Sequence, residues 1–180
     1  MRPFTLQSEL LTRGVEEVIV REHLGAGLRS GKKLRVKFGI DPTSPDLHLG
    51  HTVPLGKLRA FQDLGHKAVL IIGDFTAMVG DPSGRSEARK PLSEKEVRAN
   101  LKQYLFQAGK ILDIKKAEVR HNSEWHKKGG ASSLCGLMSG VSVQRALERD
   151  DFQNRMRQGD ELSMLEVIYP LLQGYDSVAV

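Results

Sequence analysis

The stretch LRVKFGIDPTSPDLHLGH, residues 34–51, decides the fold of this chain. Its first seven residues alternate apolar and basic side chains, which predicts a β-strand. Residues 41–46 are dense in Asp, Pro, Thr and Ser, so the strand is expected to end in a turn. From Leu47 to Leu64 the apolar spacing becomes helical, and Gly65 is expected to close the helix. The strand therefore leads through a short turn into a helix.

Two further strands extend this unit. Residues 67–73 form a continuous apolar run, which is typical of a strand buried on both faces of a parallel sheet. Ser93 and Glu96 fit a capping box, so we expect a helix from there to about Leu112, followed by a third strand at 117–120. Strand, helix, strand, helix and strand in this order predict an α/β fold, a Rossmann-like parallel sheet with flanking helices. Such sheets bind ligands where strands end and helices begin.

The N-terminal part is expected to differ from this repeating unit. Residues 7–19 have apolar positions at nearly helical spacing, which predicts an N-terminal helix. Residues 24–33 hold three glycines and are interpreted as a linker. The predicted organisation is thus an N-terminal helix and linker at 1–33, followed by a nucleotide-binding domain at 34–180.

Two more helices are expected toward the C-terminus. Their apolar patterns lie at 141–148 and 165–172. Ser163 and Glu166 make a second capping-box match before the later one. Pro170 lies inside that segment, so a kink is expected near it.

Composition narrows the class of protein. The 180 residues are 39% hydrophobic and 27% charged, which excludes a disordered or fibrous chain. A single cysteine, Cys135, points to a reducing compartment, and the absence of an apolar run near 20 residues excludes a membrane span, so a cytoplasmic location is predicted. The net charge of +5 favours polyanionic partners but is weak evidence alone.

The turn after the first strand carries two histidines. His48 and His51 are three residues apart, so they share one face at the start of the predicted helix. A helix N-terminus with two imidazole donors suits a phosphate, and Gly50 between them leaves room for a flat ring or sugar. Two surface histidines, or two metal ligands lacking a third nearby, are the alternatives from the residues alone.

This turn resembles the HIGH signature of class I aminoacyl-tRNA synthetases, and the preceding Asp-Pro-Thr and Pro-Asp resemble the tyrosyl branch in bacteria. The resemblance implies the N-terminal part of a class I catalytic domain. It implies that His48 and His51 are catalytic residues at the phosphates of ATP, with Gly50 under the nucleoside. Asp41 and Thr43 are implied to contact ATP or to lie beside it.

A polar trio marks the predicted helix near the C-terminus. Spacings of four and three place Tyr169, Gln173 and Asp176 on one side of that helix. A lone tyrosine at such spacing is usually a core residue, but three polar groups on an apolar helix need partners. The segment resembles the tyrosine-pocket helix of the same family. By that resemblance Tyr169 and Gln173 contact the α-ammonium of tyrosine, and Asp176 accepts the phenol O–H.

The resemblance extends to two other segments. The loop that begins with Gly80 and Asp81 resembles the family's GDPSG loop, in which the aspartate also holds the ammonium. Its cations Arg85 and Arg89 are implied to form a mobile loop over the pyrophosphate. Lys37 and Gly39 complete the implied tyrosine pocket, and Lys37 stands where other members place a second tyrosine near the phenol.

The implied function is tyrosine–tRNA ligase, with L-tyrosine, tRNA(Tyr) and ATP with Mg²⁺ as substrates, no tightly bound metal and no membrane. A homodimer is implied, with residues 131–150 as its candidate interface. The sequence ends at Val180, before the family's GGxDQ stretch and KMSKS loop, so this incomplete domain is expected to be inactive alone. A non-catalytic tyrosine- or partner-binding paralogue without the KMSKS half remains an alternative. A nucleotidyltransferase of the same superfamily acting on another small acid is a third.

Overall fold

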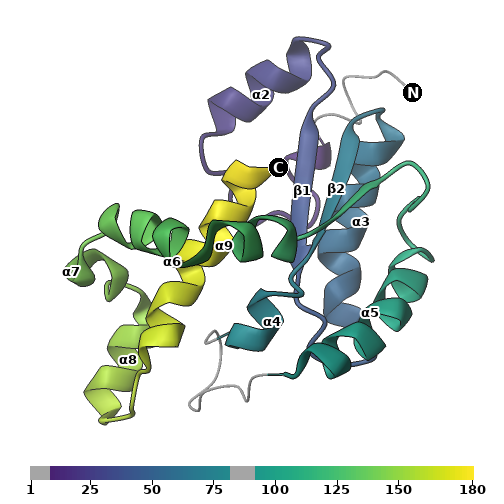
Figure 1. The fold of residues 1–180 in the computed structure, drawn as a ribbon. Coiled ribbons are helices and arrows are strands. Elements are labelled where there is room, and N and C mark those ends of the chain that lie inside the picture. The colour runs from purple at the N-terminus through teal and green to yellow at the C-terminus, as the bar shows by residue number, and fades with distance from the viewer. Residues whose placement is uncertain (1–8, 82–91) are drawn as a thin grey trace. The chain divides into compact units, whose positions relative to one another are not determined.

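The computed structural model describes residues 9–81 and 92–180, which form an α/β fold (Figure 1). Its strands are β1 (Arg35–Ile40), β2 (Lys67–Ile72) and β3 (Glu118–His121). They form a parallel sheet in the order β1-β2-β3. The three predicted strands and the Rossmann-like class are therefore confirmed, with β3 one residue later than expected.

The helices of the described residues alternate with the strands and then follow them. Each predicted crossover helix is present, whereas α4, α6 and α8 were not predicted. In chain order the helices are α2 (Arg21–Arg29), α3 (Leu49–Asp63), α4 (Thr76–Val79), α5 (Glu94–Ala108), α6 (Ser123–Ser139), α7 (Val143–Ala146), α8 (Asp150–Gln158) and α9 (Met164–Ala179).

The chain divides into two compact units, and the division passes through every strand. The first unit holds Met1–Phe38, Asp46–Leu70 and Tyr104–Val119. The second holds Gly39–Pro45, Ile71–Gln103 and Arg120–Val180. The carboxyl ends of all three strands therefore belong to the second unit, together with the segments that follow them.

The first unit is held by a hydrophobic cluster under its N-terminal segment. Leu10, Leu28 and Phe61 are buried in it, and Val36 of β1 packs against them. Lys57 of α3 donates its ammonium to backbone carbonyls of the N-terminal segment, including that of Leu10 at 3.0 Å. Burial of these apolar side chains is what stabilises the entry of the chain into β1.

The N-terminal segment departs from the sequence-based prediction. Within the expected helix at 7–19, described residues 9 and 10 are helical, 11–14 form turns and 15–18 form neither helix nor turn. Helix α2 occupies most of the expected linker. The glycines of α2 reflect close packing, since a Cβ on Gly27 would lie 3.2 Å from Leu34 Cδ2. Glycine was therefore a misleading signal for a linker here.

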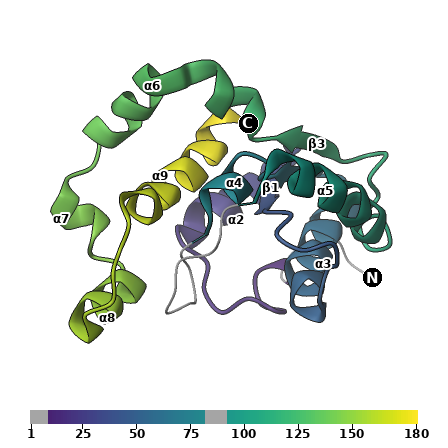
Figure 2. The same ribbon diagram turned by 60° about the horizontal axis from the view of Figure 1, so that its bottom comes forward.

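The second unit is built around α9, which packs on α4 and α6 (Figures 1 and 2). The predicted capping box is present, because Ser163 accepts from the Glu166 N–H and Glu166 accepts from the Ser163 N–H. Helix α9 runs through Pro170 to Ala179. Glu166 also forms a buried ion pair with Arg155, which ties α8 to α9.

Candidate functional site

The turn between β1 and α3 is fixed by side chains of α5. Asn100 donates to the carbonyl of Pro42 at 2.9 Å, within the second unit. In the first unit Gln107 accepts from the Leu47 N–H at 2.8 Å and donates to Asp46 Oδ1 at 2.8 Å. The amides of α5 thereby hold the two ends of this turn in place, one in each unit.

His48 and His51 form the N-terminal cap of α3. Nδ1 of His48 accepts from the Gly50 N–H at 3.1 Å, and Nδ1 of His51 accepts from the His48 N–H at 3.2 Å. The ring centroids are 3.9 Å apart. A Cβ on Gly50 would lie 2.9 Å from His48 Nδ1, so the glycine makes room for this ring to fold back. The sequence-based prediction was instead that a nucleoside lies against Gly50.

The cap sets the protonation pattern of the two imidazoles. Because Nδ1 is the acceptor in both rings, a neutral ring carries its proton on Nε2. Partial burial, reinforced by the neighbouring His48, lowers the pKa of His51, so this ring is neutral at pH 7. Two Nε2–H donors at a helix N-terminus are suited to a phosphate oxygen.

A second cluster lies at the carboxyl ends of the strands, in the second unit. Tyr169 donates its hydroxyl to Asp41 Oδ2 at 2.8 Å, and Thr76 donates to Asp41 Oδ1 at 2.8 Å. Asp41, which was predicted to lie beside ATP, therefore contacts Tyr169, which was predicted to bind the substrate tyrosine. Burial raises the pKa of Asp41 to about 6, although both hydrogen bonds oppose the shift.

Gly73 at the end of β2 is required for this arrangement. A Cβ built on it would lie 1.8 Å from Asp41 Oδ1 and 2.5 Å from Thr76 Oγ1. Any side chain at this position would displace the carboxyl or the hydroxyl. Neither Gly73 nor Thr76 was predicted as a site residue.

The cluster is acidic. The charges of Asp81 and Asp176 both help to raise the pKa of Asp41, so the three carboxyl groups are electrostatically close. Burial, followed by the charge of Asp41, raises the pKa of the Tyr169 hydroxyl, which stays protonated. Carboxyl groups gathered in this way favour a bound cation.

Asp176 is surrounded by hydrogen-bond donors from β3 and α6. Trp125 Nε1 donates to Oδ1 at 2.9 Å, and His126 Nε2 lies 3.0 Å from the same oxygen. Asn122 donates to Oδ2 at 3.3 Å and to Thr76 Oγ1 at 2.8 Å. Asn122 thereby links the carboxyl groups of Asp176 and Asp41 through Thr76. His126 was not predicted from the sequence.

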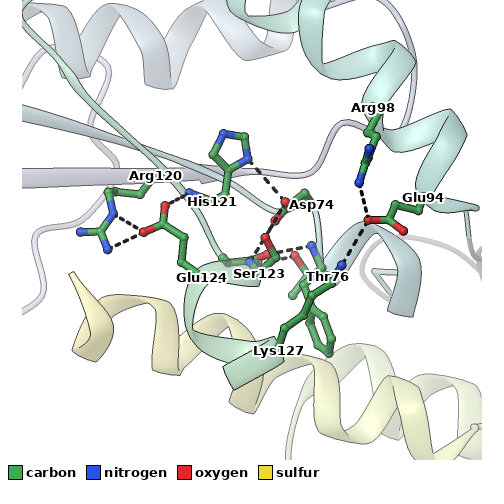
Figure 3. A network of polar contacts seen from close by, with 11 residues as sticks. Asp74, Thr76, Glu94, Arg98, Arg120, His121, Ser123, Glu124 and Lys127 are labelled. Atoms are coloured by element: carbon green, nitrogen blue, oxygen red, sulfur yellow. Dashed lines mark hydrogen bonds and ion pairs between the residues drawn. The ribbon is translucent and has the colours of Figure 1, made fainter. Parts of the chain in front are cut away.

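The start of α6 is fixed by Asp74, as Figure 3 shows. Ser123 donates its N–H to Asp74 Oδ1 at 2.9 Å and its hydroxyl to Oδ2 at 2.7 Å. His121 lies 3.4 Å from Asp74 Oδ2. The hydrogen bond from Arg120 lowers the pKa of Glu124, which accepts from the His121 N–H at 2.8 Å. This network sets the position of the helix that carries Trp125.

The other predicted site residues lie on exposed or partly exposed positions. Lys37 and Gly39 are on the exposed face of β1, and Gln173 is exposed on α9. Thr43 is half-buried, and its N–H donates to the Asp41 carbonyl at 2.8 Å. Arg85 and Arg89 lie outside the described residues.

An apolar cavity of about 330 Å³ lies between α4, α6 and α9. None of the predicted site residues lines it, although His126 and Phe75 do. It also includes Leu134 and Leu137, from the stretch predicted as a dimer interface. Within residues 9–81 and 92–180, no helix is long and apolar enough to cross a membrane, and no three His, Cys, Asp or Glu side chains form a metal cluster.

Comparison with known proteins assigns the chain to one family. The family model described as "tRNA synthetases class I (W and Y)" matches residues 29–180, which include every predicted site residue. The chain belongs to this family of class I tRNA synthetases.

Curated relatives of this chain include tyrosine–tRNA ligases. The chain is 53% identical to that of Idiomarina loihiensis over 168 residues and 52% identical to that of Deinococcus radiodurans over 180 residues. These matches cover 93% and 99% of this chain but 42% and 44% of the relatives. The chain therefore spans less than half the length of the ligases it matches.

Solved structures of tyrosyl-tRNA synthetases have a similar fold. The C-terminally truncated mitochondrial tyrosyl-tRNA synthetase of Coccidioides posadasii is 28% identical, with a TM-score of 0.77 over 97% of this chain and 51% of its own. The equivalent structure from Aspergillus nidulans is 25% identical, with a TM-score of 0.79 over 95% of this chain and 52% of its own. The fold of Archaeoglobus fulgidus tyrosyl-tRNA synthetase complexed with L-tyrosine is also similar, with a TM-score of 0.73 at 22% identity.

Proposed function

We propose that the chain is the N-terminal catalytic part of a tyrosine–tRNA ligase, which activates L-tyrosine with ATP and transfers it to tRNA(Tyr). The observation that carries the proposal is the acidic cluster of Asp41, Asp81 and Asp176 around the Tyr169 hydroxyl. It lies where the strands end, in a chain of the class I synthetase family. The names of two relatives that are 52 to 53% identical support tyrosine as the amino acid.

The cluster has the chemistry of an amino-acid pocket with two different ends. Asp81 and Tyr169 bind the α-ammonium together with Gln173, because carboxylate and hydroxyl oxygens accept from a cation. Asp41 adds a negative charge next to Tyr169. Asp176 accepts the phenol O–H at the other end, and Lys37 and Gly39 of β1 complete the wall.

The cap of α3 has the chemistry of an ATP subsite. The Nε2–H groups of His48 and His51 donate to phosphate oxygens of MgATP, which enters as the substrate with its own metal ion. Gly50 and Thr43 lie beside the nucleotide, and Arg85 and Arg89 neutralise the departing pyrophosphate. Two donors placed in advance stabilise the charge that develops on the α-phosphate.

The reaction then needs no protein nucleophile. The tyrosine carboxylate oxygen attacks the α-phosphorus of ATP, the bond to the bridging oxygen breaks, and pyrophosphate leaves with that electron pair. The 2′- or 3′-hydroxyl of the terminal tRNA ribose then attacks the tyrosyl carbonyl and releases AMP. Positioning and charge stabilisation carry both steps.

Tyrosine-dependent exchange of pyrophosphate into ATP, measured on the full-length gene product, tests this function. We expect exchange with tyrosine, and a fall of about a hundredfold in kcat for His51→Asn because one transition-state donor is displaced. His23→Asn, on an exposed position of α2, is the matched control and is expected to exchange like the wild type.

Each other outcome contradicts the proposal in its own way. Tyrosine binding without exchange in the full-length protein would indicate the non-catalytic paralogue. Exchange with another small acid and none with tyrosine would indicate a different nucleotidyltransferase. Undiminished exchange in His51→Asn would remove the assigned role of that histidine alone.

The remaining sequence predictions belong to the same proposal. We propose a homodimer through residues 131–150, which is supported by the apolar cavity beside Leu134 and Leu137. We also propose that residues 1–33 form an N-terminal segment that precedes the nucleotide-binding domain at 34–180. The cytoplasm is the proposed location, because ATP and tRNA are substrates.

A further inference from the structure

Asp176 has a defined set of hydrogen-bond partners. A carboxylate offers about four acceptor positions, two on each oxygen. Trp125 Nε1 and His126 Nε2 approach Oδ1 at 2.9 and 3.0 Å, and Asn122 Nδ2 approaches Oδ2 at 3.3 Å. The donors described here thus fill Oδ1 and half of Oδ2, so the next donor is directed to Oδ2.

The His126 ring is held in place by its surroundings. Its side chain is 4% exposed, and its ring stacks on Phe75 with centroids 5.1 Å apart and planes 26° apart. The Tyr175 ring lies 5.9 Å away on the same helix as Asp176. A ring packed in this way presents Nε2 to Asp176 in one orientation, and the contact requires a proton on Nε2 because the carboxylate can only accept.

We propose that His126 is a specificity-determining positioning residue: its Nε2–H fixes Oδ1 of Asp176 and so reserves Oδ2 for the phenol O–H of tyrosine. This rests on the proposed function, in which Asp176 binds that hydroxyl. His126 acts through Asp176 and does not itself touch the substrate. Trp125 approaches the same oxygen, and Asn122 reaches Oδ2 only at 3.3 Å, so His126 supplies the second short contact that fixes the plane of the carboxylate.

The consequence is a preference for tyrosine over phenylalanine. An oxygen held in place and already desolvated gains a full hydrogen bond from the phenol, whereas phenylalanine leaves it without that partner. If the carboxylate turned, Oδ2 would lose its alignment with the phenol. The penalty for phenylalanine would fall because the carboxylate could then find another donor, such as water.

The test compares two side chains of nearly equal shape at position 126. His126→Gln retains an N–H donor, and His126→Met does not, while both lose the stack on Phe75. Pyrophosphate exchange with tyrosine and with phenylalanine is measured on the full-length gene product for each. His121→Met is the matched control, because His121 contacts Asp74 and lies outside the proposed pocket.

For His126→Met we expect the KM for tyrosine to rise about tenfold with kcat little changed, as for loss of one hydrogen bond to a charged group. The tyrosine-to-phenylalanine ratio of kcat/KM should fall about tenfold, and His126→Gln should restore most of it. This ratio does not depend on the fraction of folded enzyme, so weaker folding of a variant does not obscure it.

Equal ratios in the wild type and His126→Met, or equal losses in His126→Met and His126→Gln, would overturn the inference while the proposed function stands. An equal fall in His121→Met would assign the effect to the packing of α6 and would also overturn it. Absence of tyrosine-dependent exchange in the wild type would remove the proposed function, and the role of His126 with it.

Discussion

Replacing Asp41 by asparagine should change how the stability of the protein depends on pH. Burial raises the pKa of the Asp41 carboxyl from 3.8 to about 6 in the folded state. The folded state therefore binds a proton more tightly than the unfolded state. This group contributes stability fully below pH 3.8 and loses that contribution as the pH rises through about 6. Asparagine has no such titration.

The size of the effect follows from the two pKa values. Their difference corresponds to about 3 kcal/mol at pH values well above 6. Between about pH 4.5 and about pH 7.5 the loss is about 2 kcal/mol. Asp41→Asn also changes the hydrogen bonds to Tyr169 and Thr76, which adds an offset at every pH. This offset is independent of pH. As the pH rises from about 4.5 to about 7.5, the free energy of unfolding of Asp41→Asn should therefore increase by about 2 kcal/mol relative to that of the wild type.

Urea unfolding followed by the fluorescence of Trp125 measures this difference, because Trp125 is the single tryptophan and contacts the same cluster. Taking the difference from wild type at each pH cancels the titration of all other groups. Asp151→Asn is the control without a trend. The hydrogen bond from Arg149 lowers the pKa of Asp151 below its usual 3.8, so its contribution to stability is already complete above about pH 4.5 and the difference of this variant from wild type should stay nearly constant over the same range.

A constant difference between Asp41→Asn and wild type across this range, like that expected for Asp151→Asn, would refute the reasoning. It would mean that Asp41 is solvated or paired with a cation in the folded state. A difference that shifts in favour of the wild type with rising pH would mean that the net effect of its hydrogen bonds exceeds that of burial.

Three further predictions concern packing and capping, each measured by urea unfolding. Gly73→Ala should destabilise the protein by about 2 kcal/mol, because the new Cβ would overlap Asp41 Oδ1, and an effect near zero would contradict the geometry. Arg155→Met should cost about 3 kcal/mol by leaving Glu166 buried without its cation, whereas the double variant Arg155→Met, Glu166→Leu should recover much of that loss. Ser163→Ala removes one half of the α9 capping box and should cost about 1 kcal/mol, with Ser163→Asp close to wild type.

The fold was predictable where one signal decided each element. Continuous apolar residues at 67–73 and alternation at 34–40 predicted β2 and β1, and the capping boxes at Ser93 and Ser163 predicted where α5 and α9 begin. The linker prediction for residues 24–33 was wrong because glycine occurs both in flexible linkers and where elements pack closely. Gly27 permits close packing against Leu34, which cannot be distinguished from flexibility without knowing its neighbour.

The candidate site was predictable in its residues and less so in its contacts. Topology alone places the turn after β1 and the segment after β2 at one edge of a parallel sheet. Sequence reasoning divided these residues between ATP and tyrosine, whereas Asp41 bonds directly to Tyr169, 128 residues away along the chain. Local spacing does not contain a contact over that separation.

The partners of Asp176 show most clearly what local pattern lacks. Asn122, Trp125 and His126 lie 50 to 54 residues before it, at the end of β3 and the start of α6. Their side chains converge because Asp74 fixes the first turn of α6 and α9 packs along that helix. A histidine next to a tryptophan on a helix carries no signal of its own. Its significance comes from the carboxylate it contacts, so such residues are found only when the packing of two distant helices is known.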